Sequence, residues 1–152
     1  MSFITEIDHV SIAVHDLDAA TEFFQRVFGL RVISTLTLPT DKYVMLGVAE
    51  SFVQLLSPTS DQSPVAKFLD QNGEGVYKLA FRVSDCAAVI DHIRAEGVER
   101  IDDKPRAPKT NGIAGFAFIH PGEVHGTLIE LVQRVDSTTV LDMIPPRGDA
   151  PV

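Results

Sequence analysis

The feature that most constrains the fold of this chain is an internal repeat, in which residues 7–33 resemble residues 76–101. Each copy begins with a strand of alternating apolar residues, followed by an aspartate that can cap a helix, Asp16 or Asp85. An amphipathic helical pattern comes next and ends at a glycine suited to a C-cap, Gly29 or Gly97. The shared order of strand, aspartate, helix and glycine indicates two copies of one structural unit.

Short runs with high β propensity follow each helix. They span residues 31–38, 43–48 and 52–56 in the first half, and residues 98–102, 115–120 and 127–132 in the second. A βαβββ unit of this kind has too few strands to cover its own apolar face, so two units are expected to share a core. The predicted fold class is α+β: two βαβββ modules related by a pseudo-twofold axis form a cupped mixed β-sheet with the helices outside. The alternative is an ordinary α+β sandwich in which the similarity between the halves is coincidental.

The same pattern predicts how the chain is organised. Residues 1–57 form the first module, 58–75 a linker, 76–134 the second module and 135–152 a C-terminal extension that we expect to be flexible. The linker contains a short helical pattern at residues 63–69, with Pro64 at its first position. A chain of 152 residues suits one structural unit with a shared core.

Composition excludes several classes of protein. The net charge of −8 argues against a nucleic-acid partner, because affinity for phosphate backbones comes from clustered Lys and Arg. The sequence shows neither an export signal nor an apolar run approaching the about 18 residues that span a bilayer. The single cysteine, Cys86, has no partner for an internal disulfide and is interpreted as a small buried residue. We therefore expect a cytoplasmic protein with no membrane partner.

Four polar residues interrupt apolar strands at matching places in the repeat. His9 and Lys78 occupy the same position in the first strand of each half, and Gln54 and Glu130 the same position in the last. Each residue alone has an ordinary explanation, such as a satisfied strand histidine, a solvent-facing side chain or a lysine on a sheet edge. Because a lone buried polar group is costly, their pairing across the repeat favours one shared site. His120, which begins a turn, is expected to line the mouth of the same cavity.

Several motifs in this order resemble the vicinal oxygen chelate (glyoxalase/bleomycin resistance/dioxygenase) superfamily. They are DHVSIAV at residues 8–14, FG at 28–29, DQSPVAKFL at 61–69, FRV at 81–83, HP at 120–121 and GTLIEL at 126–131. The resemblance covers about residues 7–134 and is greatest to the methylmalonyl-CoA epimerases.

This resemblance implies a divalent metal ion held by four side chains, one at each of the four polar positions. His9, Gln54 and Glu130 match the family's ligands, whereas Lys78 stands where the family has its second histidine. A charged lysine has no acceptor for a metal and would repel the cation. Two outcomes stay open: Lys78 pairs with Glu130 and replaces the metal, or a three-ligand site of His9, Gln54 and Glu130 keeps an open face. We expect a weakened or absent metal site, and no nucleotide cofactor.

A second departure concerns the catalytic base. The resemblance implies a pair of acid/base groups on opposite faces of the substrate, with a glutamate from the hairpin of the first half as one candidate. Residues 36–48 contain no glutamate here; their main polar side chains are Asp41, Lys42 and Tyr43.

The leading hypothesis is an epimerase or isomerase that moves a proton at a carbon next to a carbonyl. The predicted catalytic residues are Lys78, Glu130 and His9, and the predicted substrate-binding residues are Gln54, His120 and Tyr43. The alternatives are a small-molecule binding protein of the same fold and a metal-dependent glyoxalase-like or dioxygenase-like enzyme. The expected substrate is an acyl-CoA or another carbonyl compound, with Lys104, Arg106 and Lys109 as the candidates for binding CoA phosphates. The resemblance also implies a homodimer.

Overall fold

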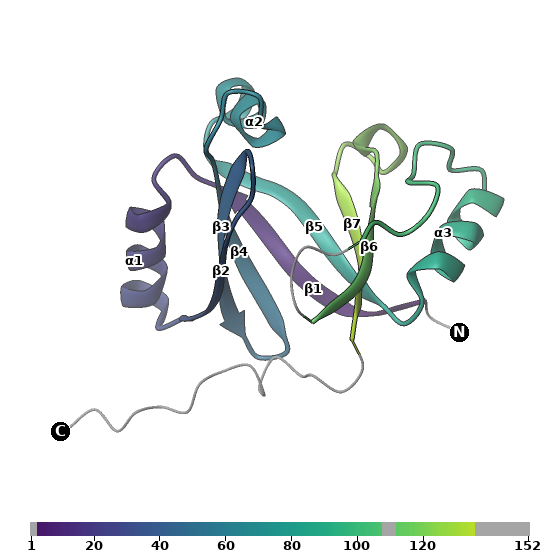
Figure 1. The fold of residues 1–152 in the computed structure, drawn as a ribbon, viewed down its shortest axis with the longest axis horizontal. Helices are drawn as coiled ribbons and strands as arrows, with labels where there is room; N and C mark the ends of the chain where they lie inside the picture. Colours follow the sequence, from purple (N-terminus) through teal and green to yellow (C-terminus); the bar gives the residue numbers. More distant parts are fainter. Residues whose placement is uncertain (1–2, 108–111, 136–152) are drawn as a thin grey trace.

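Seven strands of the described chain form one mixed sheet, in the order β2-β3-β4-β1-β5-β7-β6. The computed structural model describes residues 3–107 and 112–135 (Figure 1). Its strands are β1 (Ile4–Ala13), β2 (Arg31–Thr37), β3 (Asp41–Val48), β4 (Ser51–Pro58), β5 (Gly75–Val83), β6 (Ile113–Ile119) and β7 (Ile129–Arg134). Its helices are α1 (Leu17–Phe28), α2 (Pro64–Asn72), α3 (Cys86–Ala95) and the short 3-10 helix η1 (Pro121–Glu123).

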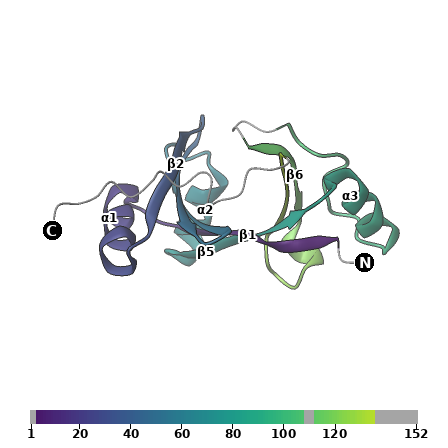
Figure 2. The same cartoon turned by 90° about the horizontal axis from the view of Figure 1, so that it is seen from below.

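The sheet is strongly curled. Figure 2 shows β1 and β5 as the floor of a trough, with β2 and β6 rising on its two sides and α1 and α3 outside. The central strands are antiparallel to each other, and each pairs in parallel with the last strand of its own half, β4 or β7. These features confirm the predicted α+β class with a cupped mixed sheet and outer helices. The pseudo-twofold relation between the halves stays a prediction.

The predicted helix boundaries follow from local capping. The side chain of Asp16 accepts a hydrogen bond from the Ala19 N–H at 2.9 Å, and Asp85 accepts one from the Ala88 N–H at 3.0 Å. Helix α1 ends at Gly29, whose φ of 68° is a left-handed conformation that glycine adopts without strain. Both aspartates are thus confirmed as N-caps.

The apolar core is divided between the two ends of the sheet. One cluster joins α1 to β3 and β4 through Leu17, Leu46 and Leu55. Another joins α3 to β6 and β7 through Ile90 and Leu131. Because the helices bury the outer sides of the sheet, the inner side of the trough is left for polar residues and a ligand.

One predicted strand is wrong. Residues 98–102 form no regular strand; isolated bridges at Ile101 and, farther along the chain, at Arg106 join this part of the chain to β6. The stretch ends at Asp102, and Asp103 and Pro105 follow within three residues; aspartate has low strand propensity, and proline has no N–H to donate. The described part of the sheet therefore has seven strands where the repeat predicts eight.

The linker contains helix α2 as predicted, with Ser63 as its N-cap and Pro64 at the first helical turn. Most of the predicted C-terminal extension, residues 136–152, lies outside the described residues. No helix in the described part of the chain is both long and apolar enough to cross a membrane.

Candidate active site

The strand register places the four polar positions on one face of the sheet. Gln54 pairs with the residue two positions after His9, and Glu130 pairs with the residue two positions after Lys78. The antiparallel register of β1 and β5 puts His9 and Lys78 diagonally across the centre of the sheet. Since side chains two residues apart in a strand share a face, all four project into the trough.

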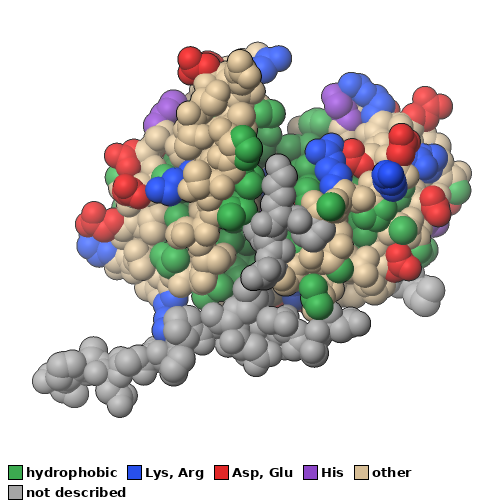
Figure 3. All heavy atoms as spheres, viewed as in Figure 1, with side chains coloured by type: hydrophobic (Ala, Val, Ile, Leu, Met, Phe, Trp, Pro, Cys, Tyr) green, Lys and Arg blue, Asp and Glu red, His purple; other side chains and the backbone are tan. Residues whose placement is uncertain are grey.

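These residues line one cavity of about 650 Å³ between the two halves. Figure 3 shows hydrophobic side chains gathered where the halves face each other. The apolar and aromatic lining consists of Leu36, Leu38, Pro39, Tyr43, Met45, Phe52, Pro64, Tyr77, Ile113, Phe116, Phe118 and Leu128. The polar lining consists of His9, Ser34, Thr40, Asp41, Gln54, Lys78, Arg106, Glu130 and Arg134. A largely apolar cavity of this size with a few convergent polar groups is typical of small-molecule sites.

A buried ion pair lies at the bottom of the cavity. The Lys78 Nζ atom lies 2.6 Å from Glu130 Oε2, and His9 Nε2 lies 3.3 Å from the same oxygen. All three side chains are buried. His9 Nε2 and Glu130 Oε2 contact each other, and Glu130 Oε2 also contacts Lys78, at the cavity wall. A bound substrate would therefore compete with Lys78 for Glu130 Oε2 and with Glu130 for His9 Nε2.

The neighbours of Glu130 determine its ionisation. Burial raises the pKa of Glu130, but the Lys78 ammonium and His9 outweigh this and hold the pKa at about 2. Burial lowers the pKa of His9, but its contacts with Asp8 and Glu130 outweigh that and raise the pKa above the usual 6.5. The resting site thus favours a carboxylate between two cationic partners.

Asp8 holds His9 from behind the cavity. It is fully buried, and its Oδ1 lies 2.8 Å from His9 Nδ1. Neighbouring residues of a regular strand point to opposite faces, but the β1–β5 register shifts between Ile7 and His9, and this bulge allows Asp8 to reach its neighbour. The pKa of Asp8 lies well below its usual range: burial opposes this shift, and the bonds to His9 and Arg134 outweigh burial. Because a carboxylate only accepts, His9 Nδ1 carries a proton whether the ring is neutral or cationic, and Nε2 faces the cavity.

Two arginines neutralise Asp8. Arg134 donates to both of its oxygens, from Nη2 at 2.6 Å and Nε at 2.8 Å, and Arg82 Nε donates at 2.9 Å. Arg82 also donates to the Glu50 carbonyl oxygen at 2.7 Å, and Arg134 lies 4.8 Å from the centre of the Phe52 ring. The network joins both halves of the sheet behind His9.

Ionised Glu130 makes the free energy of unfolding depend on pH in the acid range. Its pKa of about 2 in the folded state lies below the ordinary 4.5, so its contribution is fully present above pH 4.5 and is lost as the pH falls through 2. In denaturant unfolding between these pH values, we expect the wild type to lose about 3 kcal/mol more than a Glu130→Gln variant. Comparing the two slopes removes the acid response of Asp8, which both proteins share. Parallel slopes would contradict the low pKa of Glu130.

The residues at this site do not fit a divalent metal. The Lys78 ammonium lies against the Glu130 carboxylate, where a cation would bind. Gln54 Oε1 already accepts a hydrogen bond from the Ser11 hydroxyl at 2.5 Å. Within residues 3–107 and 112–135, no group of three or more His, Cys, Asp or Glu side chains is placed to hold a metal ion. Of the two outcomes left open by the sequence, the geometry favours the Lys78–Glu130 pair.

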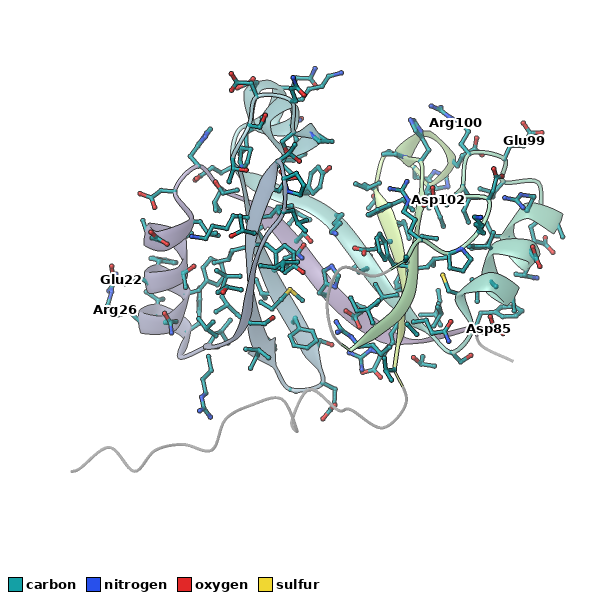
Figure 4. All side chains as sticks on the ribbon, in the orientation of Figure 1. Glu22, Arg26, Asp85, Glu99, Arg100 and Asp102 are labelled. Atoms are coloured by element: carbon teal, nitrogen blue, oxygen red, sulfur yellow. The ribbon has the colours of Figure 1, made fainter. Side chains whose placement is uncertain are left out.

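The structure separates one predicted residue from this group. His120 is exposed and does not line the cavity; its Nε2 lies 2.6 Å from Arg100 Nη2, and its Nδ1 accepts the Gly122 N–H at 3.0 Å. Figure 4 shows Arg100 near the end of the second half, away from the space between the halves. Tyr43 and Gln54, by contrast, both line the cavity.

The candidate anchors for CoA phosphates also differ in position. Arg106 lines the cavity, and two of its nitrogens bind the Asp102 carboxylate at 2.7 and 2.8 Å. Its guanidinium lies 5.0 Å from the Phe118 ring centre, and Lys78 Nζ lies 5.4 Å from that centre. Lys104 is exposed outside the cavity lining, and Lys109 lies outside the described residues.

Sequence reasoning gave no role to Asp8, Arg82 or Arg134. All three are charged residues within strands, but nothing in the sequence shows that they contact one another. Cys86 matches its interpretation as a small buried residue, and burial raises the pKa of its thiol to about 11, which disfavours the reactive thiolate.

Comparison with known proteins places these features in context. The model of the Glyoxalase/Bleomycin resistance protein/Dioxygenase superfamily matches residues 8–118. The mitochondrial methylmalonyl-CoA epimerase of Dictyostelium discoideum is 29% identical over 136 residues, which cover 86% of this chain and 80% of that protein. A variant of Streptomyces coelicolor methylmalonyl-CoA epimerase, solved with 2-nitronate-propionyl-CoA, is 38% identical with a TM-score of 0.81, covering 88% of this chain and 96% of that one. The Mycobacterium tuberculosis methylmalonyl-CoA epimerase is 35% identical with a TM-score of 0.82, and the match covers 89% of this chain and 91% of that one.

Proposed function

The chain belongs to the glyoxalase/bleomycin resistance protein/dioxygenase superfamily, and we propose that it is an epimerase or isomerase that moves a proton at a carbon next to a carbonyl. One observation carries the proposal: a buried carboxylate, Glu130, lies 2.6 Å from an ammonium and 3.3 Å from an imidazole inside a cavity that admits a small molecule. The similarity to methylmalonyl-CoA epimerases over most of the chain supports the same reaction class.

Lys78 is the proposed electrophile. When a base removes a proton from the carbon next to a carbonyl, the C–H electron pair moves toward the carbonyl oxygen and gives an enolate. A positive charge fixed beside that oxygen stabilises the enolate, and the effect is large where water is excluded. The Lys78 ammonium supplies such a charge from this chain's own residues.

Glu130 is the proposed base, although its low resting pKa makes it a weak one. That pKa is low because Lys78 is its partner, and burial alone would raise it. A substrate carbonyl that takes the ammonium as its own partner therefore makes Glu130 more basic as it binds. His9 Nε2, 3.3 Å from the same carboxylate oxygen, is placed to return a proton when the ring is cationic and to accept one when it is neutral.

The proposed substrate class is an acyl-CoA or a related carbonyl compound. The Streptomyces relative binds 2-nitronate-propionyl-CoA, and a nitronate is a flat anion that resembles an enolate. Gln54 and Tyr43 line the cavity and are the proposed substrate-binding residues. Arg106, held by Asp102, is the proposed contact for an anionic part of the substrate.

The test is exchange of the α-proton of methylmalonyl-CoA in deuterated water, followed by NMR or mass spectrometry. We expect wild-type protein to catalyse exchange and Glu130→Gln to slow it roughly 10²–10⁴-fold, the usual contribution of a general base. Exchange by the wild type no faster than by buffer would contradict the proposed reaction on this substrate.

The apolar character of most of the cavity lining favours a second function, stoichiometric binding of a small aromatic or polyketide-like ligand. This alternative predicts tight binding without turnover and little sensitivity to Glu130→Gln. Calorimetric titration together with the exchange assay separates the two functions.

We also propose that the chain acts as a homodimer in the cytoplasm. Exposed apolar residues on the central strands, Ile4, Ile7 and Val76, support an association surface. Light scattering of the purified protein measures the oligomeric state directly.

A further inference from the structure

The four polar side chains of the site occupy equivalent strand positions in the two halves of the sheet. His9 of β1 and Lys78 of β5 lie diagonally across the centre of the sheet, and Gln54 and Glu130 flank them on the next strand outward in each half. Three of these side chains offer an atom that can ligate a metal: an imidazole nitrogen, an amide oxygen and a carboxylate oxygen. Only the ammonium of Lys78 cannot.

The Lys78 ammonium is the positive charge in closest contact with the Glu130 carboxylate. Its Nζ atom lies 2.6 Å from Glu130 Oε2, and His9 Nε2 faces the same oxygen at 3.3 Å with no aligned hydrogen-bond partner among the described residues. Asp8 fixes the His9 ring so that Nε2 points into the cavity. A ring held this way by a carboxylate is the arrangement that supports metal-binding histidines.

We infer that the Lys78 ammonium is a built-in replacement for a divalent cation, and that the side chains around it form a latent metal site which the single change Lys78→His restores. The inference concerns the same cavity as the proposed function but does not require turnover. It follows from the donor set, because a histidine at position 78 removes the competing positive charge and completes two imidazoles, one amide oxygen and one carboxylate. Nitrogen and oxygen donors of this kind suit Co²⁺, Zn²⁺ and Ni²⁺.

The experiment titrates Co²⁺ into wild type, Lys78→His and Lys78→Met, following the visible absorption of bound Co²⁺ and the metal content after gel filtration. We expect Lys78→His to bind one Co²⁺ per chain, with an affinity at least about 100-fold above that of the wild type. Lys78→Met is the matched control, since it removes the positive charge without adding a ligand. We expect it to bind at least about 10-fold more weakly than Lys78→His.

Three results would overturn the inference. The first is stoichiometric Co²⁺ binding by the wild type as tight as that by Lys78→His, since the ammonium would then exclude nothing. The second is equal binding by Lys78→Met and Lys78→His, since the imidazole would then not be a ligand. The third is a Lys78→His protein that is folded by circular dichroism but binds no Co²⁺. The wild-type titration tests the inference even if Lys78→His fails to fold, and no readout depends on substrate, so failure of the proposed reaction is distinguishable from failure here.

Discussion

Replacing Lys78 with methionine is expected to slow α-proton exchange of methylmalonyl-CoA by roughly 10²–10³-fold. Methionine has a similar length but no charge, so the developing enolate loses its electrostatic partner. The carboxylate of Glu130 also loses the ammonium 2.6 Å away, and burial then raises its pKa. The measurement is the rate of deuterium incorporation at saturating substrate.

The matched control for this variant is Lys42→Met. Lys42 is an exposed strand lysine on β3 that does not line the cavity, so its loss should leave the exchange rate within about twofold of wild type. Circular dichroism of both variants shows whether the fold is intact. A folded Lys78→Met protein with the wild-type rate would remove Lys78 from the reaction.

The second large effect is on stability. Asp8→Asn keeps the size of the side chain but removes a fully buried negative charge that pairs with the partly buried Arg82 and Arg134. Removing one partner of a buried ion network leaves uncompensated charge, and we expect the free energy of unfolding to fall by about 3–5 kcal/mol. Urea denaturation of wild type and variant measures the difference.

Asp103→Ala is the control for Asp8→Asn. Asp103 also contacts an arginine, Arg94 at 3.2 Å, but its side chain is fully exposed. Exposed ion pairs contribute little, so this variant should unfold at the wild-type denaturant concentration. Equal losses in the free energy of unfolding of the two variants would mean that the burial of Asp8 does not determine how much its ion pairs stabilise the fold.

Much of the fold follows from short-range sequence signals. The caps at Asp16 and Asp85 are local interactions between a side chain and the backbone three residues on, and the repeat has one such cap in each half. The strand expected at residues 98–102 fails because β propensity alone does not specify pairing. At the end of this segment and just beyond it lie Asp102, Asp103 and Pro105, which disfavour the regular backbone hydrogen bonds of a strand pair.

The convergence of four polar side chains was also predictable, because strand periodicity and the repeat together determine which positions share a face. The Asp8 network was not predictable in the same way. It depends on a bulge after Ile7 that sequence does not reveal, and on a contact with Arg134 across 126 residues. His120 turns outward because its ring accepts the Gly122 N–H and caps the short helix η1, a local interaction that competes with a place in the cavity.

The most direct test of the account is α-proton exchange by wild-type protein before and after exhaustive dialysis against a chelator. Because the Lys78 ammonium supplies the positive charge at Glu130, we predict the same exchange rate in metal-stripped and untreated protein, with no increase on adding Co²⁺. Loss of exchange on chelation and its recovery with a stoichiometric divalent metal would show that a metal, and not Lys78, activates the carbonyl.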